Sequence, residues 1–321
     1  MAYGFVFPGQ GSQRVGMGRA WAESFPVAAE VFEQADEALG LPLSRLCFEG
    51  PEEELQLTAN TQPAILAASV AILRVLEQEG LAATAAAGHS LGEYSALVAA
   101  GALPFADALR LVRRRGELMQ QAVPVGQGAM AAILGLDIMT VNELVEEAAD
   151  EDLVCTVANF NSPQQTVIAG HTEAVKEAAR LAKLRGGGKA VLLPVSAPFH
   201  SPLMKPARRG MEPLLRETSW ADPKIPVVTN IDAAPVEDAE SALDALMRQI
   251  DGPVRWVESV RALVDDLELG IFIEVGPGNV LSGLIRRIAP EVTAVSCAEP
   301  EDLEKVRATV AGAAPGSKAE A

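Results

Sequence analysis

Short apolar runs alternate along the chain with longer stretches of helical periodicity, and this order constrains the possible fold more than any other feature. Parallel strands need a connection that crosses back over the sheet, and a helix usually supplies it. The alternation is therefore typical of an α/β domain with a mainly parallel sheet. The sequence predicts strands at four apolar runs, which are residues 5–7, 83–88, 225–230 and 271–275.

Residues 126–195 follow a different order, which predicts a second, smaller domain. Strands are expected at 129–134, 153–159, 165–169 and 189–195, and helices at 138–149 and 172–184. The resulting order, β-α-β-β-α-β, is the ferredoxin-like pattern. We therefore expect a ferredoxin-like subdomain at 126–195, inserted into a large, discontinuous α/β domain formed by 1–125 and 196–321. A cleft between the two is a natural place for a ligand.

The charge of the chain argues against nucleic acid as a partner. The 26 Lys and Arg residues are outnumbered by 43 Asp and Glu residues, which gives a formal net charge of −17 over 321 residues. Proteins that bind nucleic acid neutralise phosphates with basic side chains, and this balance opposes such binding. The three cysteines Cys47, Cys155 and Cys297 are too scattered for a disulfide framework or a metal site, so we expect a cytoplasmic location.

No segment is expected to cross a membrane. The longest apolar run, residues 63–76, contains Ser69 and Arg74 and is shorter than the roughly 20 residues that a bilayer requires. The first residues carry no basic region, and Pro8 comes before a signal-type apolar stretch develops. We expect a monomer as the default oligomeric state.

A candidate nucleophile lies at a predicted turn between a strand and a helix. The run Gly88-His89-Ser90-Leu91-Gly92 matches the pattern G-x-S-x-G, in which the glycines allow a sharp turn that exposes the serine oxygen. The apolar run 81–87 precedes the motif and a helical pattern follows it, as a hydrolase-like core requires. A glycine-flanked turn without chemistry is the alternative interpretation.

Three histidines are candidates for the base that a serine nucleophile needs. His89 lies inside the turn and should point away from Ser90, and His171 precedes a helix, where a solvated surface imidazole is expected. His200 lies in a loop that Pro198 and Pro202 stiffen, which suits a base that must be held close to its nucleophile. No carboxylate between Ser90 and His200 is an evident third member of a triad.

One arginine lies on the apolar side of a predicted helix between Pro104 and Pro124. At 100° per residue Arg113 and Arg114 point away from the apolar stripe, whereas Arg115 falls inside it. A buried guanidinium without a partner costs several kcal/mol. Its partner is therefore either an internal carboxylate or the carboxylate of a ligand.

The first predicted strand is followed by Pro-Gly-Gln-Gly-Ser-Gln at 8–13, where α/β folds bind ligands. The segment lacks the lysine of a phosphate-binding P-loop. Its glycines permit close approach of the backbone, so an N–H group there could donate to an oxyanion.

Together these motifs closely resemble the malonyl-CoA:acyl carrier protein transacylase family of bacterial fatty-acid synthesis, which is shared with the acyltransferase domains of polyketide synthases. The matching segments span nearly the whole chain in family order: 7–13, Gln62-Pro63, Gly-His-Ser-Leu-Gly-Glu-Tyr-Ser-Ala-Leu at 88–97, Arg115-Gly116 with Met119-Gln120, 198–201, Asn230 and Glu-Val-Gly-Pro-Gly at 274–278.

The resemblance implies a role for each candidate residue. Ser90 would be the nucleophile and His200 the general base, with the backbone carbonyl of Gln249 in place of the missing carboxylate. Arg115 would bind the free carboxylate of malonate. The oxyanion hole would be formed by the backbone N–H groups of the following two residues: Gln10 and Leu91.

The resemblance also implies the reaction. Ser90 would accept a malonyl group from malonyl-CoA and pass it, in a ping-pong reaction, to the phosphopantetheine thiol of acyl carrier protein, with no metal or redox cofactor. Phe199, beside the base, resembles the pattern of relatives that select malonyl over methylmalonyl. Alternatives are a free-standing acyltransferase of a polyketide pathway, and a serine esterase or patatin-like lipase whose Ser–Asp dyad would use Asp251.

Acyl carrier proteins are acidic as a class, so a chain of this charge needs a locally basic docking surface. Most surface charges are merely solvated, which is the alternative for each candidate. The candidates are Lys183, Arg185, Lys189, Lys205, Arg208, Arg209, Arg286 and Arg287.

Overall fold

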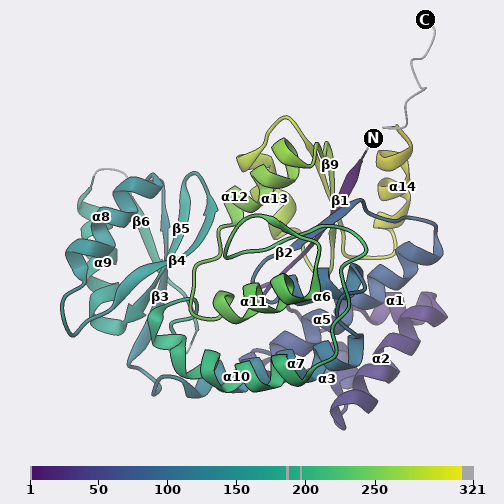
Figure 1. Ribbon diagram of the computed structural model, residues 1–321, viewed down its shortest axis with the longest axis horizontal. Coiled ribbons are helices and arrows are strands. Elements are labelled where there is room, and N and C mark those ends of the chain that lie inside the picture. The colour runs from purple at the N-terminus through teal and green to yellow at the C-terminus, as the bar shows by residue number, and fades with distance from the viewer. Residues whose placement is uncertain (1, 186–187, 196, 313–321) are drawn as a thin grey trace, which may run out of the picture.

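The computed structural model describes residues 2–185, 188–195 and 197–312, which form two β-sheets with helices packed around them (Figure 1). The larger sheet has the strand order β10-β9-β1-β2-β7-β8. Its strands are β1 (Tyr3–Phe7), β2 (Ala85–Gly88), β7 (Val227–Val228), β8 (Pro235–Val236), β9 (Ile271–Val275) and β10 (Thr293–Cys297). All neighbouring strands are parallel except β8, which pairs antiparallel with β7.

The parallel sheet is buried on both faces, because side chains alternate between two hydrophobic clusters. Phe5 and Phe7 of β1 belong to one cluster, and Val6 between them belongs to the other. The helices around this sheet are α1 (Arg19–Ser24), α2 (Pro26–Leu39), α3 (Leu43–Glu49), α4 (Glu52–Leu55), α5 (Thr58–Gln78), α6 (Gly92–Ala99), α7 (Phe105–Gln121), α10 (Lys205–Glu217), α11 (Ala239–Gln249), α12 (Trp256–Arg261), α13 (Val280–Ile288) and α14 (Asp302–Gly312), with short 3₁₀ and π turns at Pro202–Met204 and Ala262–Asp266.

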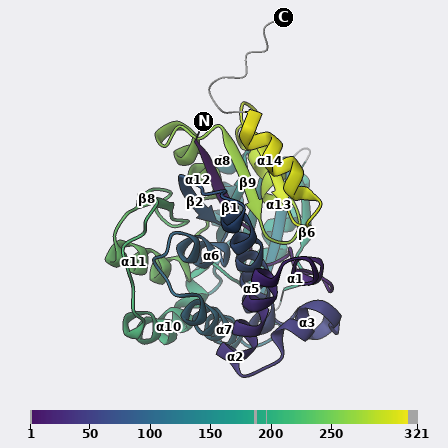
Figure 2. The ribbon, with the colours of Figure 1, turned by 90° about the vertical axis from the view of Figure 1, so that its right-hand side faces the viewer.

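Helix α5 lies at the centre of the larger core, packed against α2 and α7. Within the described part of the chain it is the one helix long and apolar enough to cross a membrane, and 83% of its most apolar window is buried inside the protein. Its apolar composition is therefore accounted for by packing. Figure 2 looks onto α5 beside β1 and α6, with α14 at the same end of the molecule as the start of β1.

The smaller sheet is antiparallel, with the order β4-β5-β3-β6. Its elements are β3 (Gly128–Leu134), α8 (Ile138–Ala148), β4 (Cys155–Ser162), β5 (Gln165–His171), α9 (Thr172–Leu184) and β6 (Lys189–Leu192). Numbered from one to four along the chain, its strands lie in the order 2-3-1-4 with both helices packed against them, which is ferredoxin-like. The predicted fold class, a parallel-sheet core with such a subdomain, is confirmed.

The predicted elements agree closely with the observed ones, except in the larger sheet. The expected strand at 225–230 contracts to two residues, Val227–Val228, and strands β8 and β10 were not predicted. The domain limits at 126 and 195 remain a prediction, and residue 196 lies outside the described residues. Strand β4 of the smaller sheet pairs with the segment between α11 and α12, where the backbone N–H of Val254 donates to the carbonyl of Ala158 at 2.8 Å and the carbonyl of Val254 accepts from Phe160 at 2.9 Å.

Candidate active site

The turn that carries Ser90 can form only because glycine stands on both sides of it. A Cβ on Gly88 would lie 1.9 Å from the carbonyl carbon of Gly92, and a Cβ on Gly92 would lie 2.0 Å from the carbonyl oxygen of Phe7. Ser90 itself has φ of 52°, which is a strained conformation for a residue with a side chain. The turn projects Ser90 from the carboxyl end of β2, beside the end of β1, where ligands bind in α/β folds.

His200 reaches Ser90 from a loop 110 residues further along the chain. Its Nε2 lies 2.7 Å from Ser90 Oγ. Its Nδ1 lies 2.9 Å from the carbonyl oxygen of Gln249 and 3.1 Å from that of Gly252. Because carbonyl oxygens only accept hydrogen bonds, the ring proton is assigned to Nδ1, and Nε2 presents a lone pair to the hydroxyl. Two backbone carbonyls therefore stand where a triad would have a carboxylate.

His200 is neutral at physiological pH. Burial, followed by the nearby positive charge of Arg115, lowers the pKa of its imidazole from 6.5 to about 3, although the carbonyl groups of Gln249 and Gly252 oppose this effect. A neutral imidazole can accept the hydroxyl proton of Ser90, so the base is available over the whole physiological range.

Arg115, from α7, is buried with 2% of its surface exposed, and it also reaches Ser90. Its guanidinium donates to Oε1 of Gln62 and to Oε1 of Gln249, each at 2.8 Å, and to Ser90 Oγ at 3.1 Å. It lies 5.7 Å from the centre of the Tyr94 ring. All three acceptors are uncharged, and no ion pair joins Arg115 to another residue that the structure describes. The alternative of an internal ion pair is therefore wrong.

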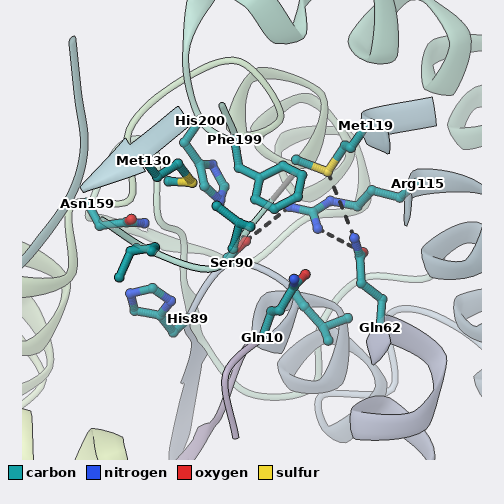
Figure 3. Close-up of a pocket in the computed structure, with 13 residues that line it drawn as sticks. Gln10, Gln62, His89, Ser90, Arg115, Met119, Met130, Asn159, Phe199 and His200 are labelled. Atoms are coloured by element: carbon teal, nitrogen blue, oxygen red, sulfur yellow. Dashed lines mark hydrogen bonds between the residues drawn. The ribbon is translucent and has the colours of Figure 1, made fainter. Parts of the chain in front are cut away.

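These side chains line one cavity of about 110 Å³ (Figure 3), which has room for a short acyl group. In Figure 3 Phe199 and His200 lie on one side of Ser90, and Gln10 and Gln62 lie on the other. Most of the surface exposed to the cavity is apolar, although several lining residues are polar and one, Arg115, is a buried cation. The lining residues are Gln10, Gln62, His89, Ser90, Leu91, Arg115, Met119, Met130, Asn159, Leu193, Val195, Phe199 and His200.

Gln10 and Leu91 flank the nucleophile, as a pair of oxyanion donors would. Both line the cavity, and neither backbone N–H donates to another residue in the described ranges. Leu91 precedes the first turn of α6, so its N–H also lies at the positive end of a helix dipole.

The other two histidines have different environments. His89 is half-buried and its Nε2 lies 2.8 Å from Oδ1 of Asn161 in the smaller sheet, while its ring packs edge-on against Trp256. Burial lowers the pKa of His89. The expectation of a solvated imidazole at His171 was wrong, because this half-buried ring accepts the backbone N–H of Val154 at 2.8 Å. Nδ1 of His171 therefore adds a hydrogen bond at the end of the β4–β5 pair.

Sequence reasoning missed three buried polar side chains around Ser90, although all lie within the matching segments. Gln62 holds Arg115, and Asn230 accepts the backbone N–H of Ser90 at 2.6 Å. Glu93 is fully buried one turn after the nucleophile. The signal in the sequence was a carboxylate and two amides in otherwise apolar surroundings, but their partners are remote along the chain.

Comparison with known proteins identifies the family. Residues 4–306 match the acyl transferase domain family. The chain belongs to this family. It is 50% identical over 299 residues to the malonyl CoA-acyl carrier protein transacylase of Escherichia coli strain K12. The aligned residues cover 93% of this chain and 96% of that protein. As an acyl transferase, it needs a nucleophile, a base and an acyl pocket, and the cavity contains candidates for all three.

Solved structures of similar proteins agree with the fold of this acyl transferase. An acyl carrier protein S-malonyltransferase from Vibrio cholerae matches with a TM-score of 0.92 and 46% identity, covering 95% of this chain and all of that one. A malonyl-transacylase solved in complex with a type II PKS acyl-carrier protein matches with a TM-score of 0.92 and 45% identity, covering 95% and 98% of the two chains. Within the described residues, no group of three or more His, Cys, Asp or Glu side chains could hold a metal.

Proposed function

We propose that this acyl transferase moves the malonyl group of malonyl-CoA to the phosphopantetheine thiol of acyl carrier protein, as a malonyl-CoA:acyl carrier protein S-malonyltransferase that supplies fatty-acid chain elongation. The observation that carries the proposal is the buried Arg115 guanidinium, 3.1 Å from Ser90 Oγ and without an ion-pair partner among the described residues. A cation beside the nucleophile favours an acyl group that ends in a carboxylate. The names of the relatives agree with this choice of acyl group.

The first half-reaction forms an ester on Ser90. Its hydroxyl proton passes to Nε2 of His200 while Oγ attacks the thioester carbonyl carbon. The negative charge that develops on the carbonyl oxygen is stabilised by the backbone N–H groups of Gln10 and Leu91, a term typically worth about 3 to 4 kcal/mol. The C–S bond breaks, the proton on His200 passes to the sulfur, and CoA departs.

The second half-reaction reverses these steps with a different thiol. The phosphopantetheine thiol gives its proton to His200 and its sulfur attacks the malonyl ester carbonyl, after which Ser90 leaves and recovers the proton. During both halves the malonyl carboxylate would take over the guanidinium of Arg115 from Ser90 Oγ. The route requires no metal and no redox cofactor.

Phe199 is proposed to restrict the acyl group. Its ring is 8% exposed and lines the cavity next to His200. A substituent on the α-carbon of the acyl group would compete with this ring for space, so malonyl should be preferred over methylmalonyl. A competition assay with the two CoA thioesters tests this preference.

Two alternatives are weighed against this proposal. A polyketide carrier is the second candidate acceptor, because one similar structure is a malonyl-transacylase bound to a type II PKS acyl-carrier protein. An esterase or patatin-like lipase would need Asp251 to activate Ser90. Asp251 instead pairs with Arg208 at 3.2 Å, while Ser90 Oγ bonds to His200 and Arg115. The lipase mechanism is therefore disfavoured.

Two of the eight basic residues that the sequence suggested for a docking surface already form ion pairs. Arg185 is paired with Glu143 and Glu147, and Arg208 with Asp251, so these charges are already balanced. The remaining candidates for contact with an acidic carrier are Lys183, Lys189, Lys205, Arg209, Arg286 and Arg287. We propose a cytoplasmic location, which the three buried, unpaired cysteines Cys47, Cys155 and Cys297 support, and a monomer as the default oligomeric state.

Labelling of the acyl-enzyme tests the proposed function. Incubation with radiolabelled malonyl-CoA should leave label on the protein, and addition of holo acyl carrier protein should discharge it. Ser90→Ala should take up no label, and His200→Ala should acylate slower by several orders of magnitude. Label that is retained in Ser90→Ala, or that water discharges as fast as the carrier does, would refute malonyl transfer through Ser90.

A further inference from the structure

A buried carboxylate lies in the helical turn that follows the nucleophile, and the reaction described above does not use it. Glu93 is the second residue of α6, and none of its surface is exposed. An isolated ionised carboxylate in such a site is costly, and it is retained only where partners compensate for its charge. The partners of Glu93 therefore indicate what it does.

The carboxylate of Glu93 holds two residues that in turn hold Ser90. Its Oε2 accepts the backbone N–H of Asn230 at 2.7 Å and Nε2 of Gln249 at 3.0 Å. Asn230 Oδ1 accepts the backbone N–H of Ser90 at 2.6 Å, and Gln249 Nε2 also donates to the carbonyl of Ser90 at 2.9 Å. Both polar groups of the strained Ser90 backbone are thus bonded to the side chains of Asn230 and Gln249, and Glu93 accepts a hydrogen bond from each of these two residues.

Glu93 also sets the orientation of the Gln249 amide. A carboxylate oxygen and the carbonyl oxygen of Ser90 can only accept, so the amide nitrogen of Gln249 must face them. Its oxygen then faces the other way and accepts from Arg115 at 2.8 Å. Gln249 therefore joins an anion on one side to a cation on the other.

Glu93 is also the carboxylate whose charge acts on the Arg115 guanidinium. Arg115 has no ion pair with a described residue, and the negative charge of Glu93 opposes the effect of burial on its pKa. One side chain, Gln249, separates the two charges. In the enzyme without substrate, Glu93 can therefore balance the buried cation.

We propose that Glu93 is a positioning residue that orients Gln249 and balances the charge of Arg115 until the carboxylate of the acyl group takes over that balance. This inference rests on the proposed malonyl transfer. Ionised Glu93 lowers the affinity of Arg115 for the malonyl carboxylate, because it already neutralises part of the charge of the guanidinium. It has no such effect on acetyl-CoA, which carries no acyl carboxylate.

The ionisation of Glu93 is balanced closely enough to respond to a second anion. Burial raises its pKa from 4.5 to about 7, against the opposing effects of the Asn230 N–H, the Gln249 amide and Arg115, while Asp232 adds to the increase. The charge of Glu93 also raises the pKa of Tyr94. Oε1 of Glu93 has no hydrogen-bond partner among the described residues, so a proton can bind there without breaking the hydrogen bonds to Oε2. Arrival of the malonyl carboxylate should raise this pKa further.

The test uses Ser90→Ala protein, which binds acyl-CoA without reacting, and measures dissociation constants by calorimetry. Glu93→Gln keeps an oxygen acceptor for both N–H groups, removes the charge and places an amide nitrogen at the position of the unpartnered Oε1. It should tighten malonyl-CoA binding by about tenfold and leave acetyl-CoA and free CoA within about twofold. With Arg115→Ala also present, Glu93→Gln should change malonyl-CoA binding by less than about twofold, because the partner of the charge is gone.

A second measurement leaves Glu93 in place, and it decides the matter if the Glu93→Gln protein does not fold. Calorimetry of Ser90→Ala protein in two buffers of different ionisation enthalpy should show proton uptake near pH 7 with malonyl-CoA and none with acetyl-CoA. The inference is overturned if no protons are taken up, or if Glu93→Gln changes malonyl-CoA and acetyl-CoA binding equally. If instead wild-type protein is not acylated by malonyl-CoA, the proposed function itself fails.

Discussion

Replacing Arg115 with alanine should shift the choice of acyl group away from malonyl and towards acetyl. The guanidinium is buried, and a malonyl carboxylate would form charge-assisted hydrogen bonds with it in place of Ser90 Oγ. Truncating one partner of a buried charge pair costs about 2 to 5 kcal/mol, which corresponds to a roughly 30- to 5,000-fold fall in kcat/KM for malonyl-CoA. Acetyl-CoA transfer loses only the hydrogen bond from the charged guanidinium to the uncharged Ser90 hydroxyl, worth about 1.5 kcal/mol or roughly 12-fold. The ratio of malonyl to acetyl transfer should therefore fall by at least about twofold.

The assay is steady-state acyl transfer to holo acyl carrier protein from each CoA thioester, with thermal unfolding to show that each variant is folded. Arg114→Ala is the matched control, because Arg114 is the preceding residue on α7, is 46% exposed and pairs with Glu117. It should leave the ratio unchanged. Arg115→Lys keeps the charge without the fork of donors and should fall between wild type and Arg115→Ala. A folded Arg115→Ala enzyme that prefers malonyl as strongly as wild type would refute the assigned role.

Three further outcomes follow from the geometry and charge. Gly88→Ala should abolish the folded turn, since its Cβ would lie 1.9 Å from the Gly92 carbonyl carbon, whereas Gly283→Ala has open space and should be tolerated in the same unfolding and activity measurements. Burial raises the pKa of Glu93 from 4.5 to about 7, so the stability that this group contributes is complete below pH 4.5 and is lost as pH rises to about 7. Relative to Glu93→Gln, wild type should therefore lose about 3 kcal/mol of unfolding free energy over that range. Urea titrations of both proteins at each pH measure this difference, and a difference that does not change with pH would contradict the prediction. Added salt should slow transfer to carrier protein more than transfer to a free pantetheine thiol, and Arg286→Glu should reduce that difference; equal salt dependence for both acceptors argues against a basic docking surface.

Local patterns in the sequence were sufficient for most elements and for the central turn. The helix predicted at 172–184 is the observed α9, and the order of strands and helices in the smaller domain was recovered, because apolar periodicity directly reflects which face is buried. The inward direction of Arg115 was also predicted from helical geometry alone, since the angle between residues on one helix does not depend on the rest of the fold.

Other features were not accessible to this reasoning. Strand β10 has five residues of moderate polarity, and its identity as a strand depends on pairing with β9. The shortened β7 reflects a pairing with β2 that covers only two residues of each strand. Strand limits follow from such neighbours, which a single segment does not specify.

The sequence by itself determined the kinds of groups available: a serine in a turn that only glycines permit, a histidine in a stiff loop and an arginine on an apolar face. Tertiary structure decided how they combine. It brought Ser90, Arg115 and His200 within hydrogen-bond distance, selected two carbonyl groups rather than a carboxylate to hold the imidazole, and linked Glu93 to Ser90 and Arg115 through Gln249. These are contacts between residues up to 159 positions apart, formed through hydrogen bonds inside a buried core. Hydrogen bonds between such remote residues form only once the sheets and helices have packed and brought the residues together in a buried site.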